Sequence, residues 1–526
     1  MLQHRLRAIL LVALSTVLIF GGGLAVSAGA LARAGTTGQV KHGGSITVLV
    51  PSGSWPQLDT ATDPSQLADA TMLNAIDGEL FEAGPHGSII YDLATGYKFS
   101  DHNLLVTITL RHGVTFQDGT PFNAQAVAFN INRDLLPANG CLCLTLFSPV
   151  SSVTASGNYT VLIHLSTPYA PLIAAFINNA VDEPESMTAV QSESATTFGQ
   201  HPIGAGPFEV VSVVPNVSIV LQKNPNYWEK GHPYLNGITF QSTTSDQSDY
   251  EALTTGQAQA TTLTTIPLVE QIKQSKGLNL TVTPTTLYYY VAFNTMKPPF
   301  NNPLVREALS YATDSKQIIK SVFDGLYPPT QALCSSQTNY CPVKKVSAYL
   351  GYNPTKAKRL ISEYQTSTGQ PFPTIQLYGF LPTNATLTEA IAQEWQAVGV
   401  TVNITIVSVI PTYVVDFRTG NWTSWVENAV QASIDPATGT FAMFGVNGLF
   451  TGANDPTLQS MLVRAQSLVS PTTRATLYQA IFQYLDKMAY GIPIYQGATI
   501  IATAKNVENY VISGGVSVND ENVWLK

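Results

Sequence analysis

The sequence predicts an α/β protein of two or three lobes, and three observations support this prediction. The chain has 526 residues, which is longer than one ordinary domain. Hydrophobic residues make up 45% of it, enough to form a large core. Over residues 374–406, a strand pattern is followed by a helix pattern and a second strand pattern, which is typical of an α/β lobe.

Residues 1–34 have the features of an export segment. Arg5 and Arg7 precede the apolar run Ala8–Phe20, and two A-x-A cleavage sites follow. The apolar run and its Gly/Ala-rich extension are also long enough for an uncleaved anchor, so a signal peptide and an N-terminal membrane anchor both remain open. Residues 35–42 are expected to be a flexible linker. Either alternative places the protein at the extracellular face of the cell membrane or in a periplasm.

A strand, a turn and a helix are predicted over residues 106–135. Val106, Ile108 and Leu110 alternate with polar residues, the period of a half-buried strand. Asn123 offers a helix cap, and apolar residues then recur every four positions.

Other elements follow from similar patterns. Alternating or continuous apolar residues predict strands over 45–50, 159–165, 217–221, 288–293, 374–380 and 400–406. Cap residues predict helices that begin after Asn302, Asp314, Asn353 and Asp455, and Leu387, Ile391 and Trp395 mark the buried face of another helix.

The composition argues against a nucleic-acid partner. Charged residues make up only 11% of the chain and the net charge is −8, with no basic stripe that could neutralise phosphates. An enzyme is not expected either. The sequence has no H-E-x-x-H, G-x-S-x-G, Walker or C-x-x-C motif, and no cofactor is expected. The acidic run 182–185 is interpreted as a solvated loop.

Four cysteines in an exported chain suggest disulfides. Cys334 and Cys341 enclose six residues and are expected to pair. Cys141 with Cys143 is the simplest second pair, although long-range pairings remain open. A metal site at Cys141 and Cys143 would need further ligands, and no His or other Cys lies close in sequence.

Four segments of the chain closely resemble family 5 extracellular solute-binding proteins, the receptors of peptide, nickel and related ABC importers. They are residues 107–133, with Leu-Arg-His-Gly-Val-Thr-Phe-Gln-Asp-Gly; 204–240, with Gly-Ala-Gly-Pro-Phe and Asn-Pro-Asn-Tyr-Trp; 288–327; and 353–410. The chain departs from the family at Gln125-Ala126, where an acid is common. It also has no Cys after the apolar run, although many members are lipoproteins.

This resemblance implies a periplasmic-binding-protein-like fold (type II, cluster C) with two lobes, a hinge and an extra inserted domain. Lobe I would comprise residues 43–75, 204–285 and 488–526. The inserted domain would cover residues 76–203, and lobe II residues 286–487.

The resemblance further implies a receptor that binds a peptide-class solute between its lobes and delivers it to the membrane subunits of an ABC permease. The expected form is a monomer, with an N-terminal membrane tether if the anchor is kept. Within the same class, an oligosaccharide or a nickel chelate is the alternative ligand. From another class, a hydrolase or chaperone on this scaffold is the alternative.

Charge clamps of peptide-binding members are missing here. Asp435-Pro436 matches the end of a pattern resembling Gly-Trp-x-x-Asp-x-x-Asp-Pro, but Ala432 stands where the amine-binding Asp is expected and Ala429 where the Trp is expected. Glu427 is a nearby substitute. Residues 378–380 hold no Arg that could pair with a ligand carboxylate.

The remaining candidates are mostly aromatic and amide side chains, which suit neutral or cationic ligands. The alternative interpretation is that the aromatic residues are core. The predicted ligand-binding residues are Trp55, Gln57, Tyr290, Tyr378, Trp422, Trp425, Glu427, Asn428, Gln431 and Asp435.

Overall fold

The structure is a computed structural model. It describes residues 40–51, 55, 57–62, 66–139, 144, 146–177, 181, 183–342, 346–380, 384–408, 419–428, 433–445, 454–514 and 517–526. The predicted signal peptide or anchor therefore lies outside the described residues. Val40–Lys526 form one compact unit. Among the described helices, none is long and apolar enough to cross a membrane.

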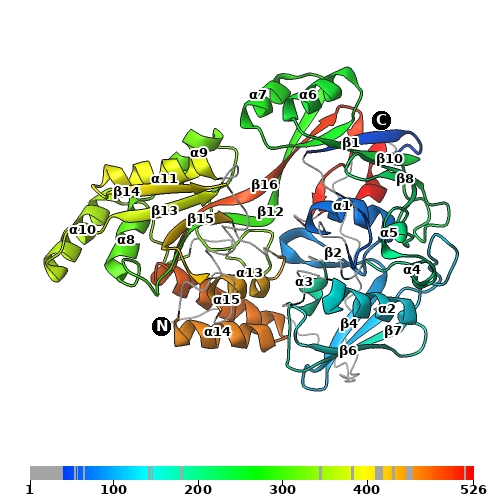
Figure 1. Cartoon of the computed structure of the whole chain (residues 1–526), viewed down its shortest axis with the longest axis horizontal. Helices are drawn as coiled ribbons and strands as arrows, with labels where there is room; N and C mark the ends of the chain where they lie inside the picture. The colour runs from blue at the N-terminus through cyan, green and yellow to red at the C-terminus, as the bar shows by residue number, and fades with distance from the viewer. Residues whose placement is uncertain are drawn as a thin grey trace, which may run out of the picture. The chain divides into compact units, whose positions relative to one another are not determined.

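A ten-stranded mixed sheet runs through this unit (Figure 1). Its order is β14-β13-β15-β12-β16-β11-β1-β10-β9-β8. The strands are β1 (Ser45–Pro51), β8 (Phe208–Val214), β9 (Ser218–Lys223), β10 (Gly237–Thr243), β11 (Ala260–Leu263), β12 (Leu278–Phe293), β13 (Ile375–Phe380), β14 (Val402–Val407), β15 (Ser424–Asn428) and β16 (Gly491–Ala504). The strands predicted at 45–50, 217–221, 374–380 and 400–406 are thereby confirmed to within a few residues, whereas the strand predicted at 288–293 is only the last part of β12, which begins at Leu278.

Two long antiparallel strands, β12 and β16, lie side by side at the middle of this sheet (Figure 1). Toward its end β12 also pairs with β15, whereas β16 pairs with β11. The register between β12 and β16 is irregular between Pro284 and Tyr288. Such irregularities bend a strand and increase its local twist.

A separate four-stranded antiparallel sheet has the order β4-β5-β7-β6. Its strands are β4 (Ala94–Ser100), β5 (Leu105–Leu110), β6 (Val150–Ala155) and β7 (Thr160–Leu165). Helix α2 (Ala124–Asp134) packs on it, and the Asn123 side chain accepts hydrogen bonds from the amides of Gln125 and Ala126. The strand, turn and helix predicted over 106–135 are confirmed, as is the strand at 159–165.

Cap residues begin four helices where the sequence predicts them. Asn302, Asp314, Asn353 and Asp455 each accept a backbone N–H at the start of α8 (Pro303–Ala312), α9 (Ser315–Phe323), α10 (Pro354–Thr368) and α14 (Pro456–Ser467), respectively. The other α-helices are α1 (Gln66–Asp77), α3 (Leu172–Ile177), α4 (Met187–Ser192), α5 (Ala195–Phe198), α6 (Asp246–Thr255), α7 (Ile266–Gln274), α11 (Ala385–Ala397), α13 (Pro436–Phe444) and α15 (Pro471–Lys487).

Short elements complete the fold. They are strands β2 (Phe81–Ala83), β3 (Ile89–Tyr91), β17 (Val507–Glu508), β18 (Ile512–Ser513), β19 (Ser517–Val518) and β20 (Trp524–Leu525), and 3-10 turns η1 (Pro85–Gly87), η2 (Pro137–Asn139) and η4 (Asp520–Asn522).

Separate apolar clusters form the core. One lies between helices α8 to α11 and strands β12, β13, β15 and β16. A second packs α1 against β1, β9 and β10, and a third fills the four-stranded sheet and α2. A fourth joins β12 and β15 to α13, α14 and α15. Of the predicted ligand residues, Trp55 belongs to the second cluster, and Tyr290, Trp422 and Trp425 belong to the fourth.

Candidate functional site

Four of the predicted ligand residues meet on the strands around β15, which lies between β13 and β12. Trp425 lies opposite Tyr378 of β13, and Glu427 lies opposite Tyr290 of β12. The Trp425 and Tyr378 rings stack with their centroids 5.0 Å apart and their planes 12° apart. The register of the sheet thus places these four side chains next to one another.

Most of this group is buried. Trp425 is 0% exposed, Tyr290 1% and Glu427 4%, and Trp422, just before β15, is 3% exposed. Asn428 ends β15. The aromatic rings pack into the apolar cluster that joins β15 to α13 and α15, so they are part of the core at this place. A direct ligand contact for any of them stays a prediction.

Trp55 and Gln57 lie in the loop after β1. The Trp55 ring is fully buried in the cluster beneath α1. The Gln57 side chain is half-buried, and its amide donates a hydrogen bond of 2.8 Å to the Thr62 hydroxyl. The structure therefore places Trp55 in a different cluster from the residues around β15.

Asp435 forms a buried ion pair. Its carboxylate accepts hydrogen bonds from both terminal nitrogens of Arg474 on α15, at 2.5 and 2.8 Å. It also accepts the Ala437 amide at the start of α13, at 2.9 Å. Both side chains are almost completely buried. The Asp435 oxygens are thus engaged inside the protein, where they hold α13 against α15.

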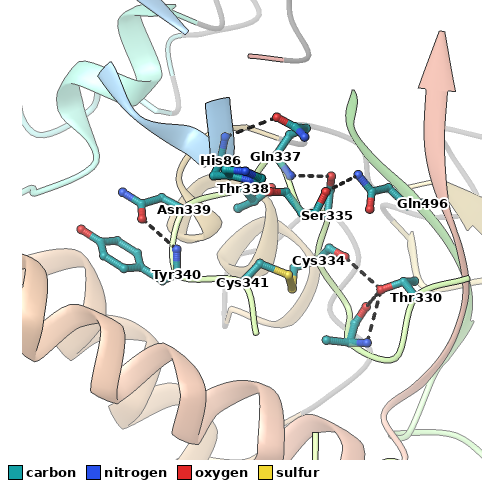
Figure 2. Close-up of a disulfide and its surroundings, with 12 residues drawn as sticks. His86, Thr330, Cys334, Ser335, Gln337, Thr338, Asn339, Tyr340, Cys341 and Gln496 are labelled. Atoms are coloured by element: carbon teal, nitrogen blue, oxygen red, sulfur yellow. Dashed lines mark hydrogen bonds between the residues drawn. A yellow bond between two sulfur atoms is a disulfide. The ribbon is translucent and has the colours of Figure 1, made fainter. Parts of the chain in front are cut away.

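A disulfide closes the loop beside this ion pair (Figure 2). Cys334 and Cys341 are bonded, which confirms the predicted pairing. Within the loop, the carbonyl of Ser336 lies 3.1 Å from the His86 Nδ1, and the Gln337 side chain accepts the His86 amide at 3.3 Å. The loop therefore contacts the η1 turn, which belongs to a distant part of the sequence.

The η1 turn approaches the loop so closely that one position requires glycine. Gly87 has φ of 74°, and a Cβ atom there would lie 2.3 Å from the backbone nitrogen of Asn339 and 2.6 Å from the carbonyl oxygen of Ile434. The Asn339 amide itself donates to the Ile434 carbonyl at 2.7 Å. Any side chain at position 87 would push these segments apart.

Tyrosines surround the ion pair. Tyr340 stacks on Tyr478 with ring centroids 5.7 Å apart, and the Arg474 guanidinium lies 5.1 Å from the Tyr340 ring centroid. From β4, Tyr97 faces the same group. Burial, and then the nearby Tyr91, Tyr340 and Asp435, raise the pKa of Tyr97 to about 12.

Sequence reasoning missed most of this second group: His86, Tyr97, Tyr340, Arg474 and Tyr478. They come from four separate segments, and none belongs to a spaced motif. Asp435 carried a signal through the Asp-Pro pair that resembles the family, and Arg474 lies on a helix that is also similar to the family, but nothing in the sequence linked the two residues.

Other expectations fall outside this region or outside the described residues. Gln431, Cys141 and Cys143 are not among the described residues. In the part of the chain that the structure describes, no group of three or more His, Cys, Asp or Glu side chains could hold a metal ion. A groove of about 610 Å³ lies at the starts of α6 and α7, and it contains none of the predicted ligand residues.

The interpretation of the acidic run 182–185 as a solvated loop is wrong for its described members. Glu183 is 3% exposed and Glu185 0%. Glu185 is buried because Arg133 of α2 reaches its carboxylate at 2.9 Å, a partner that lies 52 residues away in the chain. A short run of acidic residues can be buried when a cationic side chain from a distant part of the sequence pairs with it.

Comparisons with known proteins decide the family. Residues 88–449 match the family described as bacterial extracellular solute-binding proteins, family 5 (middle). The chain belongs to this family. This family 5 protein is 32% identical over 273 residues to the glutathione-binding protein GsiB of Salmonella typhimurium, a stretch that is 52% of each chain. The chain thus spans about half the length of the curated relatives it matches first.

Solved structures confirm the fold class. HbpA2 from Haemophilus parasuis superposes with a TM-score of 0.80 and 22% identity, covering 92% of this chain and 100% of that one. The unliganded open form of MppA, a periplasmic murein tripeptide binding protein, gives 0.80 and 21%, covering 93% and 99%. The family 5 protein therefore has the α/β two-lobed fold of periplasmic binding proteins with the extra domain, as predicted.

Proposed function

We propose that this protein is the extracellular receptor of an ABC importer, that it binds a peptide-class solute between its lobes by hinge closure, and that it releases the solute chemically unchanged to a permease. The observation that carries the proposal is the family match over residues 88–449. In this proposal the two lobes and the inserted domain have the boundaries expected from the sequence. The protein is exported, as the sequence also predicts. The protein acts as a monomer.

Two relatives support a short peptide as the ligand class. GsiB is named for glutathione and MppA for a murein tripeptide, and both ligands are built from three linked residues. An oligosaccharide or a nickel chelate is the competing ligand, and nickel transport proteins also share the fold. The described residues contain no cluster of His, Cys, Asp or Glu for bare metal, so a nickel ligand would have to arrive as a chelate.

The site favours a peptide that is held along its backbone. Ala432 stands at the position where an amine-binding Asp is expected. The carboxylate of Asp435 is already paired with the guanidinium of Arg474. A peptide can bind without end clamps when its N–H and C=O groups form strand-like hydrogen bonds and its side chains meet aromatic walls. We therefore expect the length and side chains of the peptide to matter more than its free termini.

A binding panel tests this function. The probes are tri-alanine, its N-acetylated form, penta-alanine, glutathione, maltotetraose and nickel–histidine. We expect at least one peptide to raise the melting temperature, since a ligand at about 100 times its Kd adds about 2.7 kcal/mol. Native mass spectrometry of the freshly purified protein shows what it already carries.

Two results contradict the proposal. If only maltotetraose or only nickel–histidine raised the melting temperature, the ligand would be an oligosaccharide or a nickel chelate and not a peptide. Peptides recovered in cleaved form would indicate a hydrolase, whereas intact peptides after long incubation exclude that alternative. N-acetylated and free tri-alanine should shift the melting temperature equally, because no amine clamp is expected.

A further inference from the structure

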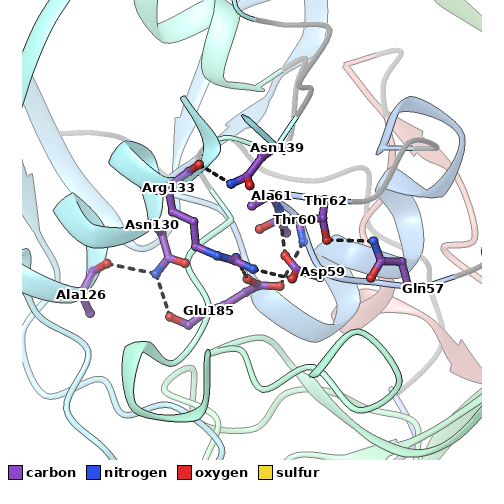
Figure 3. Close-up of polar contacts among 10 residues, drawn as sticks. All are labelled: Gln57, Asp59, Thr60, Ala61, Thr62, Ala126, Asn130, Arg133, Asn139 and Glu185. Atoms are coloured by element: carbon purple, nitrogen blue, oxygen red, sulfur yellow. Dashed lines mark hydrogen bonds and ion pairs between the residues drawn. The ribbon is translucent and has the colours of Figure 1, made fainter. Parts of the chain in front are cut away.

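Five carboxyl groups are buried close to one another, and Figure 3 shows two of them, Asp59 and Glu185, in contact with Arg133. They come from four segments of the chain: the loop after β1, the end of α1, the end of α2 and the loop before α4. Each is at most 3% exposed: Asp59, Asp77, Asp134, Glu183 and Glu185. We call this group, with Arg133, the Arg133 cluster.

The Arg133 cluster joins the loop after β1 to α2. Arg133 Nη2 forms an ion pair with Asp59, and its Nη1 donates to Glu185 Oε2 at 2.9 Å. The Thr60 amide donates to Glu185 Oε1 at 3.1 Å. On the other side, Asn130 of α2 donates to the Glu185 carbonyl at 2.7 Å. Glu185 is therefore the common contact of the loop and the helix.

The charges of this cluster do not balance when every acid is ionised. Asp59, Asp77 and Glu185 alone would place three negative charges beside the single positive charge of Arg133. Asp77 is the clearest case, because both of its carboxylate oxygens are buried without a hydrogen-bond partner in the structure. A buried carboxylate without a partner is so costly that it takes up a proton instead.

We propose that the Arg133 cluster is a proton-dependent clamp, which holds the loop after β1 on α2 in an acidic medium and loosens as the pH rises toward and above neutral. The clamp does not depend on which solute the protein binds. It suits a protein that works outside the cell, where the medium sets its protonation directly. The low content of charged side chains, 11%, fits the same acidic setting.

The charges that act on each acid support this behaviour. Burial, and then Asp59, raise the pKa of Glu185 to about 8, against an opposing effect of Arg133. Burial, and then Glu185, Glu183, Asp59 and Asp134, raise the pKa of Asp77 well above its usual value. The folded protein thus keeps protons at mildly acidic pH that the unfolded chain has already lost. By linkage, the cluster stabilises the fold in acid and this stabilisation falls as the pH rises to about 8.

Two isosteric variants test the clamp. Asp77→Asn and Glu185→Gln remove one titrating proton each and keep the size of the side chain. We compare how much the equilibrium constant for unfolding in denaturant increases for each pH unit between about pH 5 and about pH 8. The factor of increase per pH unit should be about ten times smaller in each variant than in the parent, because each variant has lost one titrating proton. Glu363→Gln, on the exposed face of α10, should keep the slope of the parent.

Hydrogen exchange gives a second, local measurement. In the parent, the Thr60 amide should exchange faster as the pH rises, beyond the intrinsic effect of base catalysis, because Asp59, Asp77 and Glu185 repel one another once they ionise and the loop then opens more often. An infrared band of protonated carboxyl groups should be present at about pH 6 and weaker in Asp77→Asn. The proposal is overturned if both variants keep the slope of the parent, or if Thr60 exchange follows base catalysis alone. A failure to fold in Glu185→Gln leaves the decision to Asp77→Asn, whose side chain forms no hydrogen bond that would be lost.

Discussion

Trp395 shows how a single residue fixes an element of this fold. It lies on α11 and is completely buried in the cluster between α8, α9, α11 and the sheet. Its indole N–H donates a hydrogen bond of 2.9 Å to the Thr313 hydroxyl, between α8 and α9. One side chain therefore supplies both apolar contact and a polar link between helices.

We expect Trp395→Ala to lower the free energy of unfolding by about 3–5 kcal/mol, because it removes a large buried ring and leaves a cavity. Urea unfolding followed by circular dichroism measures this loss. Trp395→Phe is the matched control, since it keeps most of the apolar contact but loses the hydrogen bond to Thr313, and it should cost clearly less. A neutral effect of Trp395→Ala would contradict the packing seen here.

At the scale of elements, α13 and α15 are held together by charge as well as by apolar packing. The pair of Asp435 and Arg474 lies under the disulfide-closed loop, with Tyr340 and Tyr478 covering the guanidinium. Because the pair is nearly inaccessible to water, neither charge can be solvated if the other is removed.

Removing one partner of this pair should therefore be costly. We expect Arg474→Ala to lower the free energy of unfolding by about 3–5 kcal/mol, as for other buried pairs that lose one member. Asp435→Ala should have a similar effect. The double variant should lose less than the sum of the two single changes, since neither charge is then stranded. Additive losses in a double-mutant cycle would show that the two side chains act independently.

For the whole molecule, buried acids distribute the pH response widely. Apart from the Arg133 cluster, burial raises the pKa values of Asp92, Asp520 and Asp486, which lie in different parts of the fold. For Asp486 on α15, burial raises the pKa to about 8. A raised pKa means that the folded state binds the proton more tightly than the unfolded state does.

The stability of the whole protein should therefore fall between about pH 4 and about pH 8. Asp486→Asn removes one contribution, and we expect its unfolding free energy to decrease by up to about 1.4 kcal/mol less per pH unit than that of the parent over this range. Melting temperatures measured in matched buffers test the expectation. A parent that is most stable at about pH 8 would show that these acids are ionised and compensated in the fold.

Much of the local structure could be predicted from the sequence. Asn123, Asn302, Asp314, Asn353 and Asp455 cap the helices that were expected after them, because an N-cap acts on amides two or three residues away. The disulfide between Cys334 and Cys341 could also be predicted, because the two cysteines are only seven positions apart in the sequence. The buried face of α11 followed from the helical period alone.

The candidate site could be predicted only in part. Trp422, Trp425 and Glu427 were placed in one segment, but their burial depends on α13 and α15, which approach from later in the chain. Arg474 reaches Asp435 across 39 residues, and Arg133 reaches Asp59 across 74. The spacing of neighbouring residues in the sequence gives no information about contacts between residues so far apart.

The sequence by itself indicated the family, through the segments that resemble it, and many of the strands and helices, since these elements depend on short-range hydrogen bonding and on the period of apolar side chains. The tertiary structure alone decided which charges meet. Coulomb and desolvation energies depend on distance and burial in space, so a run of acids that looks solvated in the sequence becomes a buried, proton-binding cluster once α2 and the loop after β1 close around it.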